Sequence, residues 1–193
     1  MASTNRRLTL REETPAHALD AAVLVLLTPA GEKENLLEWE VLLIRRNEYP
    51  GIHSGQISFP GGRYEEKDTD LWETACREAF EETGIPKNNV DKVGSLTNLY
   101  IPVSNFLIHP FVATSVAATE IRTDPREVAS YKRVSLKIFD PENAVLRDFD
   151  YPDGTKRPAP AWLYEGYTIW GATAMILAEL YLSICEKTLI LNN

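Results

Sequence analysis

The order of apolar and polar residues along the chain predicts several strands and two helices. Runs rich in leucine, isoleucine and valine predict a central strand over residues 21–27 and a second strand over 38–46. The sequence GEKEN between them is typical of a turn, so the two strands should form a hairpin. A short strand is expected over 56–59, ending at the sequence PGG, where the chain must turn. Further strands are expected over 93–100, 106–113 and 128–134.

The clearest helix signal lies over residues 70–83. Asp70 can cap the first turn, and Gly84 stands where a left-handed residue commonly ends a helix. Small and apolar residues recur at helical spacing and define an inward face, whereas the acidic residues should occupy the outer face. The inward face consists of Trp72, Ala75, Cys76, Ala79 and Thr83.

The remainder of the chain completes a mixed α+β pattern. Residues 140–160 are rich in Asp, Pro and Gly and predict a loop, with a β-hairpin as the alternative, and 171–186 predict a second amphipathic helix. This order of strands and helices indicates the α+β class. We expect a single domain over residues 20–187, preceded by an arm, 1–19, and followed by a tail, 188–193.

Composition narrows the classes of function. The chain has 28 acidic and 20 basic residues, and its net charge of −8 argues against nucleic acid or an anionic membrane as the partner. The apolar run over 21–27 is too short to span a bilayer, and the two cysteines, Cys76 and Cys185, cannot build a disulfide framework. We therefore expect a cytoplasmic protein with a small-molecule partner. The oligomeric state stays open, with a homodimer as one option.

The acidic surplus is concentrated in one segment. Residues 63–82 carry eight acidic and three basic side chains, a net charge of −5. Glu78, Glu81 and Glu82 fall on nearly one face of the predicted helix, because positions three and four apart are neighbours. Such a cluster is either a solvated surface or a site for a cation, and oxygen donors alone suit Mg²⁺ or Mn²⁺. The preceding glycine pair would allow the backbone to approach a phosphate or a metal closely, and a plain turn is the alternative.

This segment resembles the Nudix box, whose pattern is G-x5-E-x7-R-E-U-x-E-E-x-G-U, with U aliphatic. The first half departs from the pattern: counted from Gly62, Asp68 replaces the glutamate, and eight residues instead of seven precede Arg77. The second half matches at every fixed position, and Ala79 and Ile85 occupy the aliphatic positions. The matching residues are Arg77, Glu78, Glu81, Glu82 and Gly84.

The one-residue expansion is similar to the coenzyme A pyrophosphatase branch of the family. A second signature of that branch, roughly L-L-x-x-R-[SA]-x-x-x-R-x-x-x-G-x-x-x-F-P-G-G, also resembles this chain, although Asn47 replaces the small residue and Gly51 the second arginine. Without that arginine the substrate is open, and Arg45 or His53 could substitute for it. The matching residues are Leu42, Leu43, Arg46, Gly55, Phe59, Pro60, Gly61 and Gly62.

The resemblance, which covers about residues 21–186, implies a Nudix fold, an α/β/α sandwich with a mixed sheet between helices. It also implies hydrolysis of a diphosphate with Mg²⁺ or Mn²⁺ as cofactor. Arg77 is expected to orient a box glutamate, and Glu127 is a candidate added metal ligand or base, with a surface glutamate as the alternative. The candidate residues are Arg77, Glu78, Glu81, Glu82 and Glu127 for catalysis, Glu78, Glu81 and Glu82 for the metal, and Arg46, Gly61 and Gly62 for the substrate.

The resemblance further implies that coenzyme A or an acyl derivative is cleaved to 3′-phosphoadenosine 5′-phosphate and a phosphopantetheine product. Two alternatives stay open. One is the same chemistry on ADP-ribose, a dinucleotide or a nucleoside triphosphate. The other is a nucleotide-binding module without activity. The intact set of three helical glutamates argues against this alternative.

Overall fold

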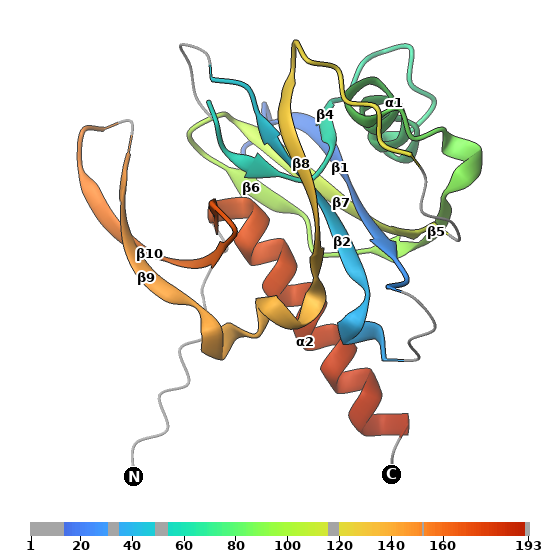
Figure 1. Ribbon diagram of the computed structural model, residues 1–193. Coiled ribbons are helices and arrows are strands. Elements are labelled where there is room, and N and C mark those ends of the chain that lie inside the picture. Colours follow the sequence, from blue (N-terminus) through green and yellow to red (C-terminus); the bar gives the residue numbers. More distant parts are fainter. Residues whose placement is uncertain (1–13, 31–34, 49–53, 116–119, 152, 192–193) are drawn as a thin grey trace, which may run out of the picture.

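The computed structural model describes residues 14–30, 35–48, 54–115, 120–151 and 153–191. In this part of the chain a mixed eight-stranded sheet lies between two helices, α1 (Leu71–Thr83) and α2 (Gly171–Leu191), and a small three-stranded sheet packs beside α2 (Figure 1). The strands of the main sheet are β1 (Leu19–Thr28), β2 (Glu40–Arg46), β3 (Ile57–Ser58), β4 (Gly61–Arg63), β5 (Asp91–Ser95), β6 (Leu99–Ile101), β7 (Phe106–Thr114) and β8 (Val128–Ser135). The small sheet comprises β9 (Val145–Asp150), β10 (Lys156–Tyr164) and β11 (Tyr167–Trp170).

Strand β1 is the centre of the main sheet. It runs parallel to β7 and antiparallel to β2 and β4, and the path through the sheet is β3-β2-β1-β7-β5. Strand β8 pairs with β2, and β6 pairs with β7. The antiparallel pairing of β1 with β2, in which Leu27 lies opposite Val41, agrees with the predicted hairpin. The mixed sheet between two helices confirms the expected fold class.

Alternation along β1 separates two hydrophobic cores. Because successive side chains of a strand point to opposite faces, Ala22 and Leu24 pack in the core beneath α1, whereas Val25 and Leu27 pack in the core beneath α2. Half of the buried residues in the α1 core are alanine or cysteine, and the α2 core contains several aromatic rings. Helix α1 can therefore lie close to the sheet.

One sequence prediction on the main sheet is wrong in detail. The predicted strand over 93–100 is two strands, β5 and β6, because Pro110 of the neighbouring β7 has no N–H group to continue the ladder. The short strand expected to end at PGG is β3, which ends at Ser58. The glycines do not form a plain turn, because Gly61 begins β4, which pairs with β1 so that Gly61 lies opposite Val23.

The C-terminal part also differs from its prediction. The hairpin alternative for 140–160 is correct, since β9 and β10 pair antiparallel and β11 adds a third strand. Trp170 stacks on Phe149 of this hairpin, with ring centroids 3.8 Å apart. Helix α2 continues to Leu191, past the predicted end at Glu186, because no Gly or Pro follows its first residue, so 188–191 of the expected tail are helical.

Both cysteines are free, and Cys76 is buried in the α1 core, where burial raises the pKa of its thiol to about 11. Within the described ranges no helix has the length and apolar character that crossing a membrane requires.

Candidate active site

Helix α1 is fixed at both ends by local signals of its own sequence. The side chain of Asp70 accepts a hydrogen bond from the backbone N–H of Glu73 at 2.7 Å, and Gly84 ends the helix in the left-handed conformation. Ala75 and Ala79 are buried against the sheet. The glutamates of the last two turns are thereby held over β1, β2 and β4.

Glu82 is buried, with 1% of its side chain exposed, although the sequence pattern assigns the acidic residues to the outer face. Its Oε2 accepts a hydrogen bond from the N–H of Gly61 at 2.9 Å, and its Oε1 lies 3.5 Å from Nη1 of Arg46. Burial raises the pKa of Glu82 to about 7, even though Arg46 and Gly61 favour its charged form. The prediction for the outer face is therefore wrong at Glu82, because position 82 falls on the same helical arc as Ala75 and Ala79.

Glu78 is half-buried and packs directly on Gly62. A Cβ atom at Gly62 would lie 2.5 Å from the carboxyl carbon of Glu78, so the glycine makes room for this carboxylate. Burial also raises the pKa of Glu78, against the lowering effect of Arg77. Position 61 requires glycine for a different reason. Its φ is +154°, and a Cβ atom there would lie 2.4 Å from the carbonyl oxygen of Ala22. In this structure the two glycines position glutamates, and their contact with substrate stays a prediction.

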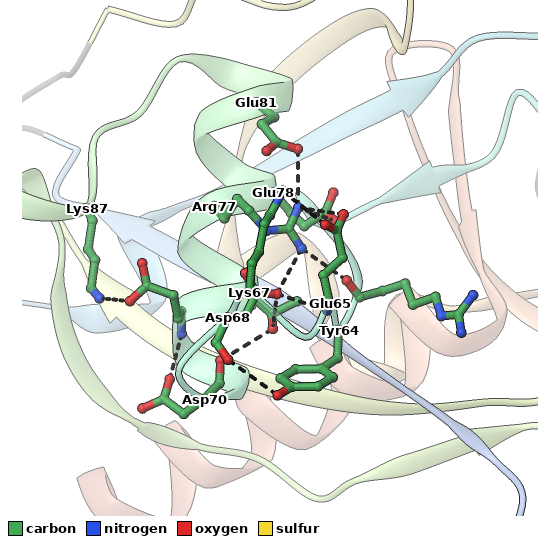
Figure 2. Close-up of polar contacts among 12 residues, drawn as sticks. Tyr64, Glu65, Lys67, Asp68, Asp70, Arg77, Glu78, Glu81 and Lys87 are labelled. Carbon is green, nitrogen blue, oxygen red and sulfur yellow. Dashed lines mark hydrogen bonds and ion pairs between the residues drawn. The ribbon is translucent and has the colours of Figure 1, made fainter.

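Arg77 is the centre of an ion-pair network (Figure 2). Its Nε and Nη2 donate to the two carboxylate oxygens of Asp68 at 2.8 and 3.0 Å, a bidentate geometry that fixes the guanidinium. Its Nη1 donates to Glu78 at 2.8 Å and to Glu81 at 3.2 Å, and lies 3.6 Å from Glu65. This arrangement agrees with the expectation that Arg77 orients box glutamates.

Asp68 is buried beside Arg77, and it is the residue that departs from the family pattern. It also accepts hydrogen bonds from the N–H of Glu65 at 3.1 Å and from Oγ1 of Thr74 at 2.9 Å. The Arg77 guanidinium, with these bonds, holds the pKa of the Asp68 carboxyl well below its usual range. Asp68, although shorter than the glutamate of the family pattern, thus still anchors Arg77.

Glu127 lies near the helical glutamates although it is far from them in sequence. Its carbonyl oxygen accepts a hydrogen bond from the N–H of Asn47 at 2.9 Å, and the N–H of Asp124 donates to the carbonyl of Glu82 at 3.2 Å. After burial, the negative charge of Glu127 adds a small contribution to the raised pKa of both Glu78 and Glu82. Glu127 itself is exposed.

The two adjacent arginines of β2 separate as strand alternation predicts. Arg46 points to Glu82 on the α1 side, whereas Arg45 lies 3.5 Å from Glu48 at an exposed position. Sequence reasoning missed the role of Asn47, whose Nδ2 donates to the carbonyl of Pro125 at 2.8 Å and so ties β2 to the segment before Glu127. No spacing pattern signals such a contact. Gly51 and His53 lie outside the described residues.

The side chains present fit a hard divalent cation by their chemistry. Glu78, Glu82, Glu81 and Glu127 offer only oxygen donors, which Mg²⁺ and Mn²⁺ prefer. In the part of the chain that the structure describes, no group of three Asp, Glu, His or Cys side chains is arranged to hold a metal ion, and Glu78, Glu81 and Glu82 form ion pairs with Arg77 or Arg46 instead. A cation would bind in competition with those contacts.

The family model for the NUDIX domain matches residues 18–153. An uncharacterized Nudix hydrolase NudL from Pectobacterium atrosepticum is 35% identical over 148 residues, which are 76% of each chain. The protein of that name from Klebsiella pneumoniae subsp. pneumoniae is 33% identical over 185 residues, covering 91% of this chain and 89% of that protein.

Solved structures resemble the fold at lower identity. A MutT/nudix family protein from Enterococcus faecalis superposes with a TM-score of 0.53 at 15% identity, over 88% of this chain and 62% of that chain. The Nudix hydrolase RenU from M. smegmatis superposes with a TM-score of 0.51 at 20% identity, over 62% and 71%. The domain match, the two relatives and the fold agree, and the chain belongs to the Nudix hydrolase family.

Proposed function

We propose that this Nudix pyrophosphohydrolase uses Mg²⁺ or Mn²⁺ to hydrolyse the diphosphate of coenzyme A or an acyl-coenzyme A. The products would be 3′-phosphoadenosine 5′-phosphate and (acyl-)phosphopantetheine. One observation carries the proposal: Glu82 and Glu78 of α1 lie against Gly61 and Gly62 of the PGG sequence, and Arg46 lies 3.5 Å from Glu82. Clustered carboxylates repel one another and the substrate alike, unless cations stand between them.

In this proposal Glu78 and Glu82, with Glu81, hold the cation. When bound, a divalent cation neutralises diphosphate oxygens and lowers the pKa of a water molecule, and each effect is commonly worth several kcal/mol. Arg77 keeps Glu78 and Glu81 in place through its ion pairs and is anchored in turn by Asp68. Arg46 is suited to a substrate phosphate, because its guanidinium lies at the carboxylates, where its ion pair with Glu82 is 3.5 Å long. Glu127 is the added ligand or the base.

The choice of coenzyme A rests on the signature that ends in FPGG. Its matching arginine is Arg46, the arginine that lies at the carboxylates, and its matching Phe59 is buried next to Pro60. The two free cysteines support a reducing, cytoplasmic location for this activity.

A substrate panel tests the proposal. The purified protein is incubated with coenzyme A, acetyl-coenzyme A, ADP-ribose, a dinucleoside polyphosphate and a nucleoside triphosphate, each with Mg²⁺, with Mn²⁺ and with a chelator. We expect kcat/KM to be highest for coenzyme A or its acyl form, with 3′-phosphoadenosine 5′-phosphate as a product, and no turnover in the chelator. Faster cleavage of ADP-ribose with no turnover of coenzyme A would overturn the substrate. Absence of any turnover would favour a binding module.

A further inference from the structure

Ser58 carries a buried hydroxyl group that is left unpaired. Among the residues that the structure describes, its Oγ is the one buried side-chain oxygen or nitrogen atom without a hydrogen-bond partner. Other hydroxyl groups in the same region are paired: Oγ1 of Thr74 donates to Asp68, and Oγ1 of Thr173 donates to the carbonyl of Ile57. A buried hydroxyl without a partner destabilises the folded state, so such groups are rare in native structures and require an explanation.

Strand register places Ser58 on the face of the sheet that carries the candidate site. Ser58 lies opposite Ile44 in the pairing of β3 with β2, and directly opposed residues share a face. Its neighbour Ile57 packs in the α2 core, so the side chain of Ser58 points to the other face, toward α1. Arg46 follows Ile44 by two residues and occupies that same face, where it meets Glu82.

Ser58 is a neighbour, by strand register and by sequence, of the two groups that hold Glu82. One of these is Arg46, the diagonal neighbour of Ser58 across the strand pair, and the other is Gly61, three residues after Ser58 in the chain. Two neighbours of Ser58 therefore contact the carboxylate that the proposed function assigns to the cation. The Ser58 hydroxyl itself makes no hydrogen bond to Glu82.

We propose that Ser58 is a positioning residue for the cation, whose Oγ accepts a hydrogen bond from a water molecule that the divalent cation carries beside Glu82. Mg²⁺ gives up its water molecules reluctantly and usually keeps several of them in protein sites. Groups that bond to the ligands of a metal, and not to the metal, orient those ligands and affect affinity. The inference rests on the metal dependence of the proposed function and is independent of the coenzyme A assignment.

The test is the Ser58→Ala variant, with Ser135→Ala as its matched control. Ser135 also lies in the main sheet, but its Oγ donates to the carbonyl of Leu37 at 3.3 Å. Thermal unfolding of both variants and of the unaltered chain is measured in a chelator and over a Mg²⁺ titration, because a ligand that binds the folded state raises the Tm. Apparent Mg²⁺ Kd values follow from these curves without any assay of activity.

For Ser58→Ala we expect an unchanged or higher Tm in the chelator, because no hydrogen bond is lost, and an apparent Mg²⁺ Kd that is about tenfold weaker. For Ser135→Ala we expect a lower Tm in the chelator and an unchanged Mg²⁺ Kd. An unchanged Mg²⁺ Kd in Ser58→Ala overturns the inference and leaves the proposed function standing. No effect of Mg²⁺ on the unaltered chain overturns both, whereas a normal Mg²⁺ response without turnover of coenzyme A overturns the substrate alone.

Discussion

The two faces of the main sheet are built to different rules, although the same strands supply both. On the α2 face, large apolar side chains such as Phe139, Trp162 and Leu177 fill the core. On the α1 face, alanines and Cys76 bring the helix close, and a glutamate and an aspartate are buried beside it. Both faces bury apolar surface, and the α1 face buries charge as well.

Within one domain, the α2 face therefore mainly stabilises the fold, whereas the α1 face carries the candidate site. Apolar burial stabilises the fold, whereas a carboxylate taken out of water costs free energy unless its partners compensate fully. The raised pKa of Glu82 indicates that Arg46 and Gly61 do not compensate fully. The α1 face is held in place by its own apolar core and the helix caps, and it keeps charged groups that a purely structural core would exclude.

The largest loss of stability is expected on the α2 face. Leu177→Ala removes a fully buried side chain and should lower the free energy of unfolding by about 3 kcal/mol in urea denaturation. The activity per folded molecule should not change, because Leu177 lies in the core beneath α2 and not at the carboxylates. Leu182→Ala, at a 51% exposed position of the same helix, is the control and should change stability by less than about 0.5 kcal/mol.

A smaller loss is expected where the α1 face buries a paired charge. Asp68→Asn breaks the bidentate pair with Arg77 and should lower the free energy of unfolding at pH 7 by about 2 kcal/mol. It should also reduce turnover, because Arg77 then loses the anchor that orients Glu78. Asp91→Asn, at an exposed position, is the control for the loss of one carboxylate.

The pH dependence of stability gives the same variant a second readout. Asp68 has a lowered pKa in the folded protein, so its contribution is present above the ordinary aspartate pKa and is lost as the pH falls through the folded value. The unaltered chain should therefore lose stability below about pH 4, and Asp68→Asn should lack that part of the loss. Parallel pH curves for the two proteins would contradict the pairing of Asp68 with Arg77.

The smallest change in stability is expected at Gly62. In Gly62→Ala the new Cβ pushes the carboxylate of Glu78 aside, and because that side chain is flexible the free energy of unfolding should fall by less than about 1 kcal/mol. Displacing the carboxylate should reduce kcat/KM about tenfold. Gly94→Ala, where no atom lies within 4 Å of the new Cβ, should change neither quantity. A large loss of stability with full activity would show that Gly62 serves the fold and not the site.

The sequence predicts the elements whose signals are local. Helix α1 was predictable because Asp70, Gly84 and the spacing of Ala75 and Ala79 lie within one short segment. The hairpin of β1 with β2 follows from two apolar runs and a turn. The division between β5 and β6 depends on Pro110 in another strand, which no local pattern reveals.

The candidate site also has a part that the sequence predicts and a part that depends on the fold. The motif names Glu78, Glu81 and Glu82, yet the burial of Glu82 depends on how α1 packs on the sheet. The network around Arg77 needs Asp68 and Glu65 from the preceding segment, and their distances to Arg77 exist only in the fold. No sequence pattern singles out Ser58. It is identified by a buried hydroxyl group without a hydrogen-bond partner and by its register in the sheet.

The central claim is that the α1 face keeps Glu82 buried for chemistry at a cost in stability, and Glu82→Gln tests it most directly. Unfolding is measured in a chelator, and hydrolysis of the preferred substrate is measured with Mg²⁺, with the exposed Glu142→Gln as control. We expect Glu82→Gln to be at least as stable as the unaltered chain, because a neutral amide of the same shape removes the buried charge, and to lose about 1,000-fold in kcat. Full activity, or a loss of stability of several kcal/mol with activity retained, would contradict the account.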